Sequence, residues 1–283
     1  MGIKESALSA ITSIADTDFV RVVTAAGASR RILVPNLLPI EKGANGHNSI
    51  FRGKSLGSSI STAQNQAIKD RTYTDLYIGD YWTIGGVNYR IAALDYYYSC
   101  GDTNFTKGHV IVVPDSVLYN APMNATNITD GGYSGSAMFL GTSITVSDTT
   151  YTGLANARTT IANAFGSHVA SHRIICTNAT SSGKPSGWAW RDSDGIELMN
   201  EQQVYGAPAW RDAAQNGYDV GTQKMQFPLF LYAPRFVNTR QNYWLQDVRS
   251  ASIFALVDLT GAANYTGASL AYGVRPAITL SYI

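Results

Sequence analysis

The last forty residues constrain the fold most, because framework residues alternate there with polar and aromatic ones. A strand sends successive side chains to opposite faces, so this alternation predicts a sheet with one buried and one displayed side. The residues expected to form the buried framework are Trp244, Phe254, Gly273, Val274, Arg275 and Pro276. The residues expected to be displayed, and so the candidates for ligand binding, are Asn242, Tyr243, Gln246, Arg249, Asn264, Tyr265 and Tyr272.

Arg275 is interpreted as structural, because it stands between Val274 and Pro276 in a framework segment. A guanidinium can donate to several backbone carbonyls at once, and proline fixes the direction of the strand that follows. Contact with a ligand is the alternative for Arg275.

Short apolar segments upstream predict further strands at residues 76–78, 81–84, 89–94 and 110–113. Gly85 and Gly86 suit a tight hairpin turn between the second and third. The segment 110–113 is apolar on both faces and should therefore be a central strand.

Apolar residues recur at helical spacing over 154–165, and Gly166 is placed to end that helix. A second short helix is expected at 196–205. Helices between early and late strands indicate an α+β domain, which we assign to residues 72–283.

The N-terminal region contains two strand-like segments, 19–24 and 29–34, around a turn of small residues at 25–28. One or two helical turns are expected at 4–15. A unit of this size buries too little surface to be stable alone. Residues 1–40 are therefore predicted to attach to other proteins or to oligomerise, and residues 41–71, rich in Gly, Asn and Ser, to form a linker or extended arm.

Composition argues against several classes of partner. Only 14% of the residues are charged and the formal net charge is +1, so the basic excess typical of nucleic-acid binding is absent. No apolar run of 18 residues occurs, so no membrane span is expected. The two cysteines, Cys100 and Cys176, are too few for a disulfide scaffold and are expected to be reduced.

No motif predicts a cofactor or a metal. Gly53-Lys54-Ser55 lacks the preceding glycine of a phosphate-binding loop, because Asn48 stands at that position. His168 and His172 have the spacing of two ligands on a helix, but Gly166 should end the helix before them. The acidic run Asp192, Asp194 and Glu197 is interpreted as a solvated turn that leads into a helix at Glu197, with a bound ion as the alternative.

The C-terminal segment Tyr243-Trp244-Leu245-Gln246-Asp247-Val248 and the Gly273-Val274-Arg275-Pro276-Ala277 motif resemble the ending of C-type-lectin-like domains in bacteriophage structural proteins. The resemblance covers residues 45–283. It also includes segments 75–82, 89–92, 112–115, 126–129, 171–173 and 197–206. It implies a C-type-lectin-like fold of short antiparallel strands, about two helices and long loops, in a virion surface protein that is not an enzyme.

Formylglycine-generating enzymes share this general fold, and their chemistry depends on a cysteine pair near the C-terminal end. Residues 177–283 contain no cysteine, which argues against such an oxidase. Some phage relatives are diversified at exposed Asn, Tyr, Ser, Asp and Thr positions near the C-terminus, and residues 242–272 match that style.

Three functions follow as hypotheses. The first is a receptor-binding or fibre protein that docks on the virion through residues 1–40, forms a homotrimer and binds a bacterial surface glycan or protein. The second is a decoration or head-fibre protein with a mainly structural role. The third is a glycan-cleaving enzyme, which would need two facing carboxylates in a cleft.

Overall fold

The computed structural model describes residues 19–23, 29–33, 43–129, 131–177, 180–181, 184–185, 188–207, 209 and 225–283. The chain forms two compact units, Met1–Lys42 and Gly43–Ile283. In the first unit, β1 (Phe19–Val23) pairs antiparallel with β2 (Ser29–Leu33), as predicted. The expected turn at 25–28 and the helical turns at 4–15 lie outside the described residues.

The larger unit, called the body below, contains a five-stranded antiparallel sheet in the order β13-β18-β5-β4-β3. Its strands are β3 (Tyr81–Ile84), β4 (Val87–Leu94), β5 (His109–Pro114), β13 (Ile196–Leu198) and β18 (Pro276–Ser281). Every residue of β5 is buried, and β5 is the central strand, as predicted. Gly85 and Gly86 form the turn between β3 and β4 with φ of 59° and 79°, which suits glycine.

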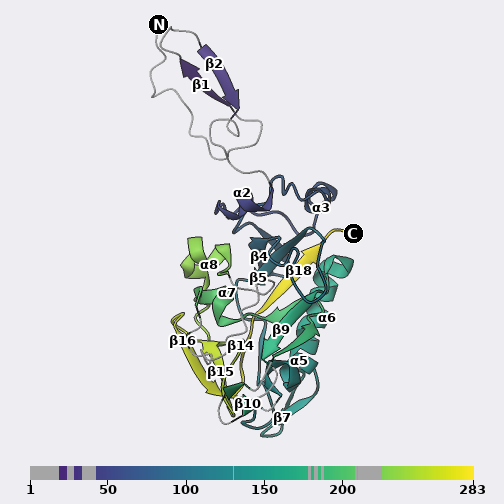
Figure 1. The fold of residues 1–283 in the computed structure, drawn as a ribbon, viewed down its shortest axis with the longest axis vertical. Coiled ribbons are helices and arrows are strands. Elements are labelled where there is room, and N and C mark those ends of the chain that lie inside the picture. The colour runs from purple at the N-terminus through teal and green to yellow at the C-terminus, as the bar shows by residue number, and fades with distance from the viewer. Residues whose placement is uncertain are drawn as a thin grey trace. The chain divides into compact units, whose positions relative to one another are not determined.

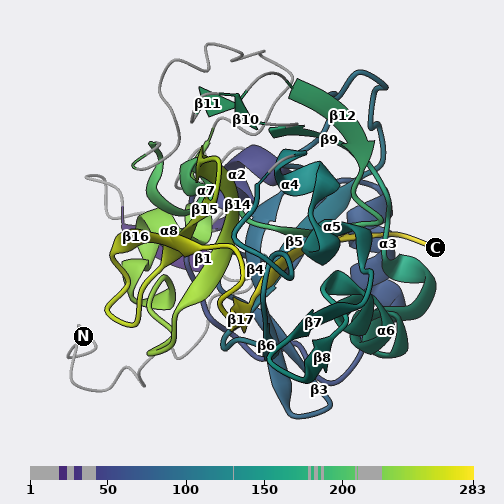
Figure 2. The ribbon, with the colours of Figure 1, turned by 90° about the horizontal axis from the view of Figure 1, so that it is seen from below.

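A second five-stranded sheet has the order β16-β15-β14-β17-β6 (Figures 1 and 2). Its strands are β6 (Tyr119–Ala121), β14 (Tyr243–Ser250), β15 (Ile253–Val257), β16 (Ala263–Gly267) and β17 (Tyr272–Val274). Only the pairing of β14 with β17 is parallel. Three strand pairs complete the set: β7 (Ile144–Val146) with β8 (Thr149–Tyr151), β9 (Arg173–Thr177) with β12 (Trp188–Asp192), and β10 (Thr180–Ser181) with β11 (Lys184–Pro185).

The longest described helix, α6 (Leu154–Phe165), has the predicted bounds and ends at Gly166, whose φ is 55°. Its buried residues, Leu154, Ala157, Ile161 and Phe165, form the predicted apolar stripe. The other helical segments are short: α2 (Ala44–Asn48), α3 (Thr62–Lys69), α4 (Gly132–Gly135), α5 (Ala137–Leu140), α7 (Glu201–Tyr205), α8 (Pro228–Tyr232), η2 (Gly166–His168) and η3 (Pro234–Phe236).

Two predicted elements are wrong in part. The expected helix over 196–205 begins only at Glu201, because residues 196–198 form β13 and pair with β18. Asn200 then caps α7 in a reciprocal capping box with Gln203. Residues 76–78 do not form the expected strand, and their one strand-like feature is an isolated bridge between Ile78 and Phe51.

The linker predicted at 41–71 is wrong from Gly43 onward, because residues 43–71 belong to the body. Ile68 of α3 is fully buried in the core. Asp80 is also fully buried, and Arg52 contacts its Oδ2 at 2.5 Å through Nη2. A buried carboxylate is stable only with a partner of opposite charge, and Arg52 supplies it from the predicted linker. The body therefore begins at Gly43 and not at Thr72.

The body is therefore a mixed α+β structure of mostly antiparallel sheets and few helices. One apolar core cluster includes residues of both sheets and of α6. The C-terminus lies against α3, where the backbone N–H of Ile283 donates to Asn65 Oδ1 at 3.0 Å. Within the described ranges, every helix is too short or too polar to cross a membrane.

Candidate binding surface

Strand β14 carries Tyr243, Gln246 and Arg249 of the predicted ligand-binding set, and it lies in the middle of the second sheet. Its residues 243–248 are all buried. Tyr243 and Gln246, predicted to be displayed, are therefore framework residues. Tyr243 is fully buried, and Gln246 is buried with its Nε2 donating to Leu198 O at 3.1 Å. The prediction fails because a strand covered on both faces has no displayed side, whatever its alternation.

Arg275 explains why Tyr243 is buried. The guanidinium is fully buried and donates to three carbonyl oxygens, those of Pro114, Phe236 and Val237. It also donates to the Tyr243 hydroxyl at 3.2 Å, and that hydroxyl donates to Val237 O at 2.9 Å. This network fixes segment 236–237 against the sheet, which is the structural role predicted for Arg275.

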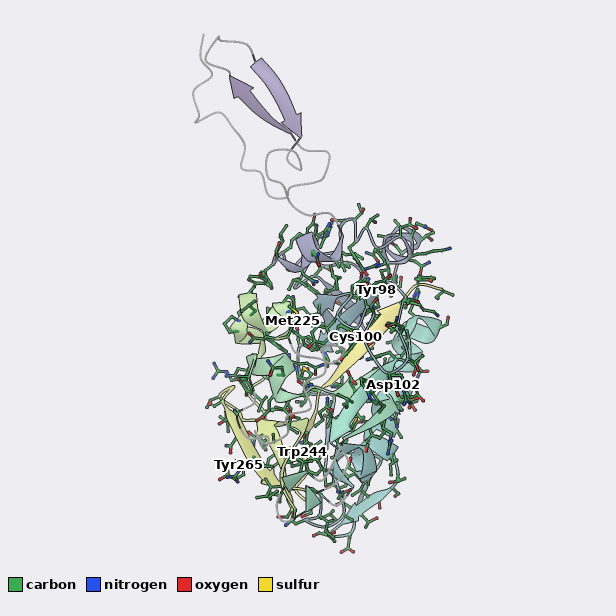
Figure 3. The ribbon with its side chains drawn as sticks, in the orientation of Figure 1. Tyr98, Cys100, Asp102, Met225, Trp244 and Tyr265 are labelled. Carbon is green, nitrogen blue, oxygen red and sulfur yellow. The ribbon has the colours of Figure 1, made fainter. Side chains whose placement is uncertain are left out.

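The predicted framework residues Trp244, Phe254, Val274, Gly273 and Pro276 are all buried. Trp244 Nε1 donates to Ala121 O at 2.8 Å, and Figure 3 shows the side chain in the interior of the body. A Cβ added at Gly273 would lie 2.7 Å from Asn242 O, so a larger residue cannot fit. The framework half of the pattern is thus confirmed.

The remaining predicted residues lie at or near the surface. Asn264 is exposed on the edge strand β16, and Tyr265, Arg249 and Tyr272 are half-buried. The Arg249 guanidinium carbon lies 3.6 Å from the centroid of the Tyr265 ring, within the range of a cation–π contact. In Figure 3 the Tyr265 side chain lies at the rim of the body.

The other two members of this group differ in their surroundings. The Tyr272 ring packs edge-on against Trp244, with centroids 5.5 Å apart. Asn242 is half-buried, and its Oδ1 is buried without a hydrogen-bond partner among the described residues.

A loop that the strand pattern did not single out adjoins this part of the sheet. Thr129 binds the turn between β14 and β15: its N–H donates to Ala251 O at 2.9 Å and its hydroxyl to Ser250 O at 2.5 Å. Asn127 Oδ1 accepts from the backbone N–H and the hydroxyl of Ser269, at 3.0 and 2.8 Å. Asn and Thr side chains that hydrogen-bond to the backbone are typical of ordered turns. The Asn and Thr residues of segment 124–129 are therefore the sequence feature that could have indicated this loop.

These contacts bring three loops together. We call the loops 124–129, 250–252 and 267–271, together with Arg249, Asn264 and Tyr265, the sheet-end surface. Ile128 and Leu270 are exposed there by 50% and 47%, although each belongs to a loop that is bonded in place. An ordered surface with exposed apolar, aromatic and amide groups can bind a ligand at low entropic cost.

A buried polar cluster lies elsewhere in the body, around Glu197 of β13. Glu197 was expected in a helix that follows a solvated turn, which is wrong because the residue lies in β13 and its side chain is almost completely buried. The Tyr97 hydroxyl donates to Glu197 Oε1, and Gln203 Nε2 donates to the Tyr97 hydroxyl at 2.9 Å. His172 Nε2 lies 3.9 Å from Glu197 Oε1.

Burial determines the charge of this cluster. It raises the pKa of Glu197 to about 8 and lowers the pKa of His172 to about 3. Both groups are therefore neutral at pH 7, and their proximity is not an ion pair. Burial also raises the pKa of the Cys176 thiol well above its ordinary value, which makes that thiol unreactive.

Shifted pKa values often mark catalytic groups, but geometry favours a structural role here. The pocket of about 400 Å³ beside His172 is lined by Asp192 and Arg173 and not by Glu197. Asp192 is the single carboxylate in that lining, so the pocket lacks the facing pair that the glycan-cleaving hypothesis requires.

The structure gives no support to the two metal sites considered from the sequence, one at His168 and His172 and one at Asp192, Asp194 and Glu197. His168 Nδ1 bonds to Ser281 O at 2.9 Å, whereas His172 Nδ1 bonds to the Ser193 hydroxyl at 3.0 Å. Within the described part of the chain, no group of three His, Cys, Asp or Glu residues is placed to hold a metal ion. Cys100 and Cys176 do not form a disulfide bond.

Comparisons of the chain with protein-family models, with curated proteins and with solved structures found no match.

Proposed function

We propose that this chain is a bacteriophage virion surface protein whose body has a C-type-lectin-like fold and binds a bacterial surface glycan or protein. Residues 1–40 dock on the particle, and the chain is a homotrimer. The proposal rests on the sequence resemblance over residues 45–283, with which the antiparallel α+β architecture is compatible. It needs no cofactor, and assembly takes place in the host cytoplasm.

The observation that carries the binding role is the construction of the sheet-end surface. Asn127 and Thr129 tie loop 124–129 to two other loops through hydrogen bonds. The loops are thus ordered without a ligand, while Ile128, Leu270 and Asn264 stay exposed. Preorganised loops on a rigid sheet are a common basis for recognition.

The position of this surface within the body suits display. Figure 1 shows β15 and β16 toward one end of the body, and α2, α3 and the C-terminus toward the other. Gly43, where the body begins, directly precedes α2. Within the body, the chain therefore begins at the end away from β15 and β16.

Two measurements with the full chain test the proposal. Antibody-labelled electron micrographs of the phage that encodes this chain should show label on the particle surface. Purified protein, added to host cells before infection, should reduce phage adsorption by competing for the same receptor. Particles without label, or adsorption unaffected at saturating protein, would contradict the virion and receptor-binding parts respectively.

The decoration or head-fibre function is the second candidate, and one observation favours it. Leu231 and Tyr232 of α8, together with Met225, are exposed by 57%, 48% and 69%. Exposed apolar side chains of neighbouring segments are typical of surfaces that associate. Light scattering of the full chain at micromolar concentration should give the trimer mass, and a monomer mass would contradict the oligomer in both candidates.

A further inference from the structure

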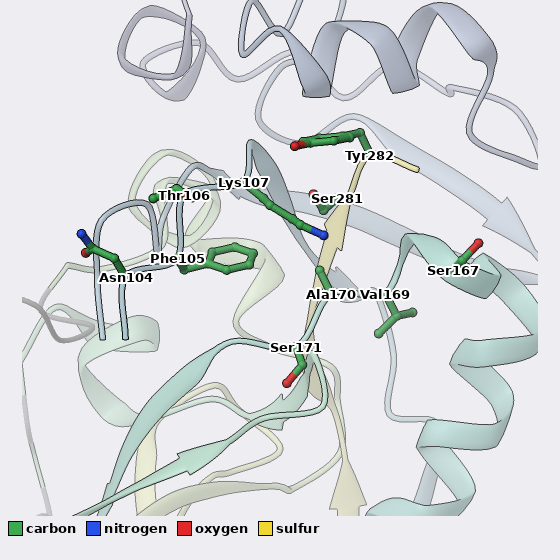
Figure 4. A pocket seen from close by; sticks show the side chains of 10 residues that line it. All are labelled: Asn104, Phe105, Thr106, Lys107, Ser167, Val169, Ala170, Ser171, Ser281 and Tyr282. Carbon is green, nitrogen blue, oxygen red and sulfur yellow. The ribbon is translucent and has the colours of Figure 1, made fainter. Parts of the chain in front are cut away.

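A pocket of about 370 Å³ opens between loop 104–107, segment 167–171 and the end of β18 (Figure 4). This volume is within the range of about 300–1,000 Å³ that is usual for small-ligand sites. The pocket borders Tyr282, near the C-terminus, whereas the sheet-end surface belongs to the second sheet. The two are different sites, and the inference below does not depend on the proposed function.

The walls of the pocket are held by rigid elements. The backbone N–H of Ala170 donates to Thr279 O at 3.0 Å, and Val169 forms an isolated bridge with Leu280, so segment 167–171 is fixed to β18. Phe105 packs against the buried rings of His109 and His172, at centroid distances of 4.9 and 5.6 Å. The apolar part of the lining is therefore ordered without a ligand.

The polar part of the lining is available for binding. The side chains of Asn104, Thr106, Ser167 and Ser171 are exposed, and none hydrogen-bonds to another described residue. They supply an amide and three hydroxyl groups around an apolar base. Such groups suit a sugar, because a sugar ring presents hydroxyls at its rim and C–H groups on its faces.

The positive charge in the pocket lining favours an acidic sugar over a neutral one. Lys107 is the only charged residue in its lining, and Figure 4 shows its amine directed into the pocket between Ser171 and Tyr282. Lys107 Nζ forms no salt bridge with any described carboxylate, and it lies 5.9 Å from the centroid of the Tyr282 ring. Lys69 Nζ lies at the same distance from that ring and adds a second positive charge nearby.

We propose that this pocket binds an acidic saccharide residue of the hexuronic acid type. The carboxylate pairs with Lys107, the hydroxyls bond to Asn104, Thr106, Ser167 and Ser171, and one face of the sugar ring lies against Phe105. A neutral sugar gains only the last two sets of contacts, and a bare inorganic anion gains only the first.

The test is a titration of the isotope-labelled full chain with glucuronate, followed by NMR. Saturable shifts should be confined to the amides of residues 104–107, 167–171 and 281–282. Glucose and acetate should bind the same amides at least about fivefold more weakly, which is the order expected for loss of one exposed charge pair or of the hydroxyl contacts. Inorganic phosphate should compete poorly.

Two variants identify the cation. Lys107→Gln should reduce the affinity for glucuronate to that for glucose, and Lys107 is exposed, so the variant should fold normally. Arg240→Gln, which removes one charge from an exposed side chain outside the lining, should leave the affinity unchanged. Absence of saturable shifts, equal affinity for glucose or phosphate, or an unchanged Lys107→Gln variant would each overturn the proposal.

Discussion

Tyr243 and Tyr265 belong to the same sheet and to the same polar, aromatic stretch of sequence, but their environments differ. Tyr243 stands on the central strand β14, fully buried, with its hydroxyl bonded to Val237 O and Arg275. Tyr265 stands on the edge strand β16, half-buried under Arg249. The position of a strand in the sheet, and not the type of residue, decides which aromatic side chain can meet a ligand.

The largest effect expected from this contrast is on stability at the centre of the sheet. Trp244→Ala should lower the free energy of unfolding by about 3–5 kcal/mol, because it empties a fully buried site and removes a hydrogen bond. Tyr265→Ala should lower it by about 1 kcal/mol or less, mainly through loss of the cation–π contact. Urea denaturation of both variants measures the difference, and equal losses would contradict the contrast.

The next effect concerns a buried carboxyl group in the other sheet, that of Glu197. Glu197 has a pKa of about 8 in the folded protein and an ordinary value of 4.5, so above pH 4.5 the folded state holds a proton that the unfolded state has lost. This contribution to stability is complete below pH 4.5 and is lost as pH rises to 8, at about 1.4 kcal/mol per pH unit.

Two buried histidines act in the opposite direction at lower pH. Burial lowers the pKa of His109 to about 4 and that of His172 to about 3, from 6.5. Below pH 6.5 the unfolded state therefore binds protons that the folded state does not, and stability falls as the pH falls. Together the three groups predict maximal stability near pH 6.5.

Glu197→Gln separates these contributions. Between pH 6.5 and 8 the unmodified protein should lose about 2 kcal/mol of stability, whereas the variant should lose much less, since glutamine does not titrate. The loss of stability toward acid pH should remain and become steeper between pH 6.5 and 4.5, because Glu197 no longer offsets the two histidines there. Urea denaturation at several pH values measures both limbs, and an unchanged alkaline limb in the variant would show that Glu197 is not the titrating group.

A smaller effect distinguishes the two tyrosine hydroxyls directly. Tyr243→Phe leaves Val237 O and Arg275 without one buried partner and should cost about 1–3 kcal/mol. Tyr265→Phe removes a hydroxyl from a half-buried ring at the edge and should change stability by no more than about 0.5 kcal/mol. If both changes have the same cost, the two hydroxyls do not differ in environment.

Sequence reasoning succeeded where the signal was local. The apolar stripe of α6, its end at Gly166 and the doubly apolar β5 follow from residues close together in the chain. It failed at β14, because the segments that pack on this strand, such as α4 and β9, are distant from it in the sequence. It also failed at residues 43–71, whose place in the body depends on long-range contacts such as Arg52 with Asp80.

The candidate site divides in the same way. Alternation identified Trp244 and Phe254 as framework, because both are apolar and buried. It could not separate Tyr243 from Tyr265, because a tyrosine can be buried where its hydroxyl finds a hydrogen-bond partner. For Tyr243 these partners are Val237 O and the distant Arg275. Loop 124–129 was missed as a part of the surface because its hydrogen bonds join residues more than a hundred positions apart.

The adsorption of phage particles carrying Asn264→Ala and Tyr265→Ala tests the central claim most directly. The double change should leave the thermal midpoint within a few degrees, because these side chains lie on an edge strand. Particles carrying Thr62→Ala and Gln66→Ala, two exposed positions on α3, serve as the matched control. We predict that adsorption to host cells falls at least about tenfold for the β16 pair and is unchanged for the α3 pair. Equal adsorption by both variants, on a phage that needs this chain to bind, would contradict the recognition role of the sheet-end surface.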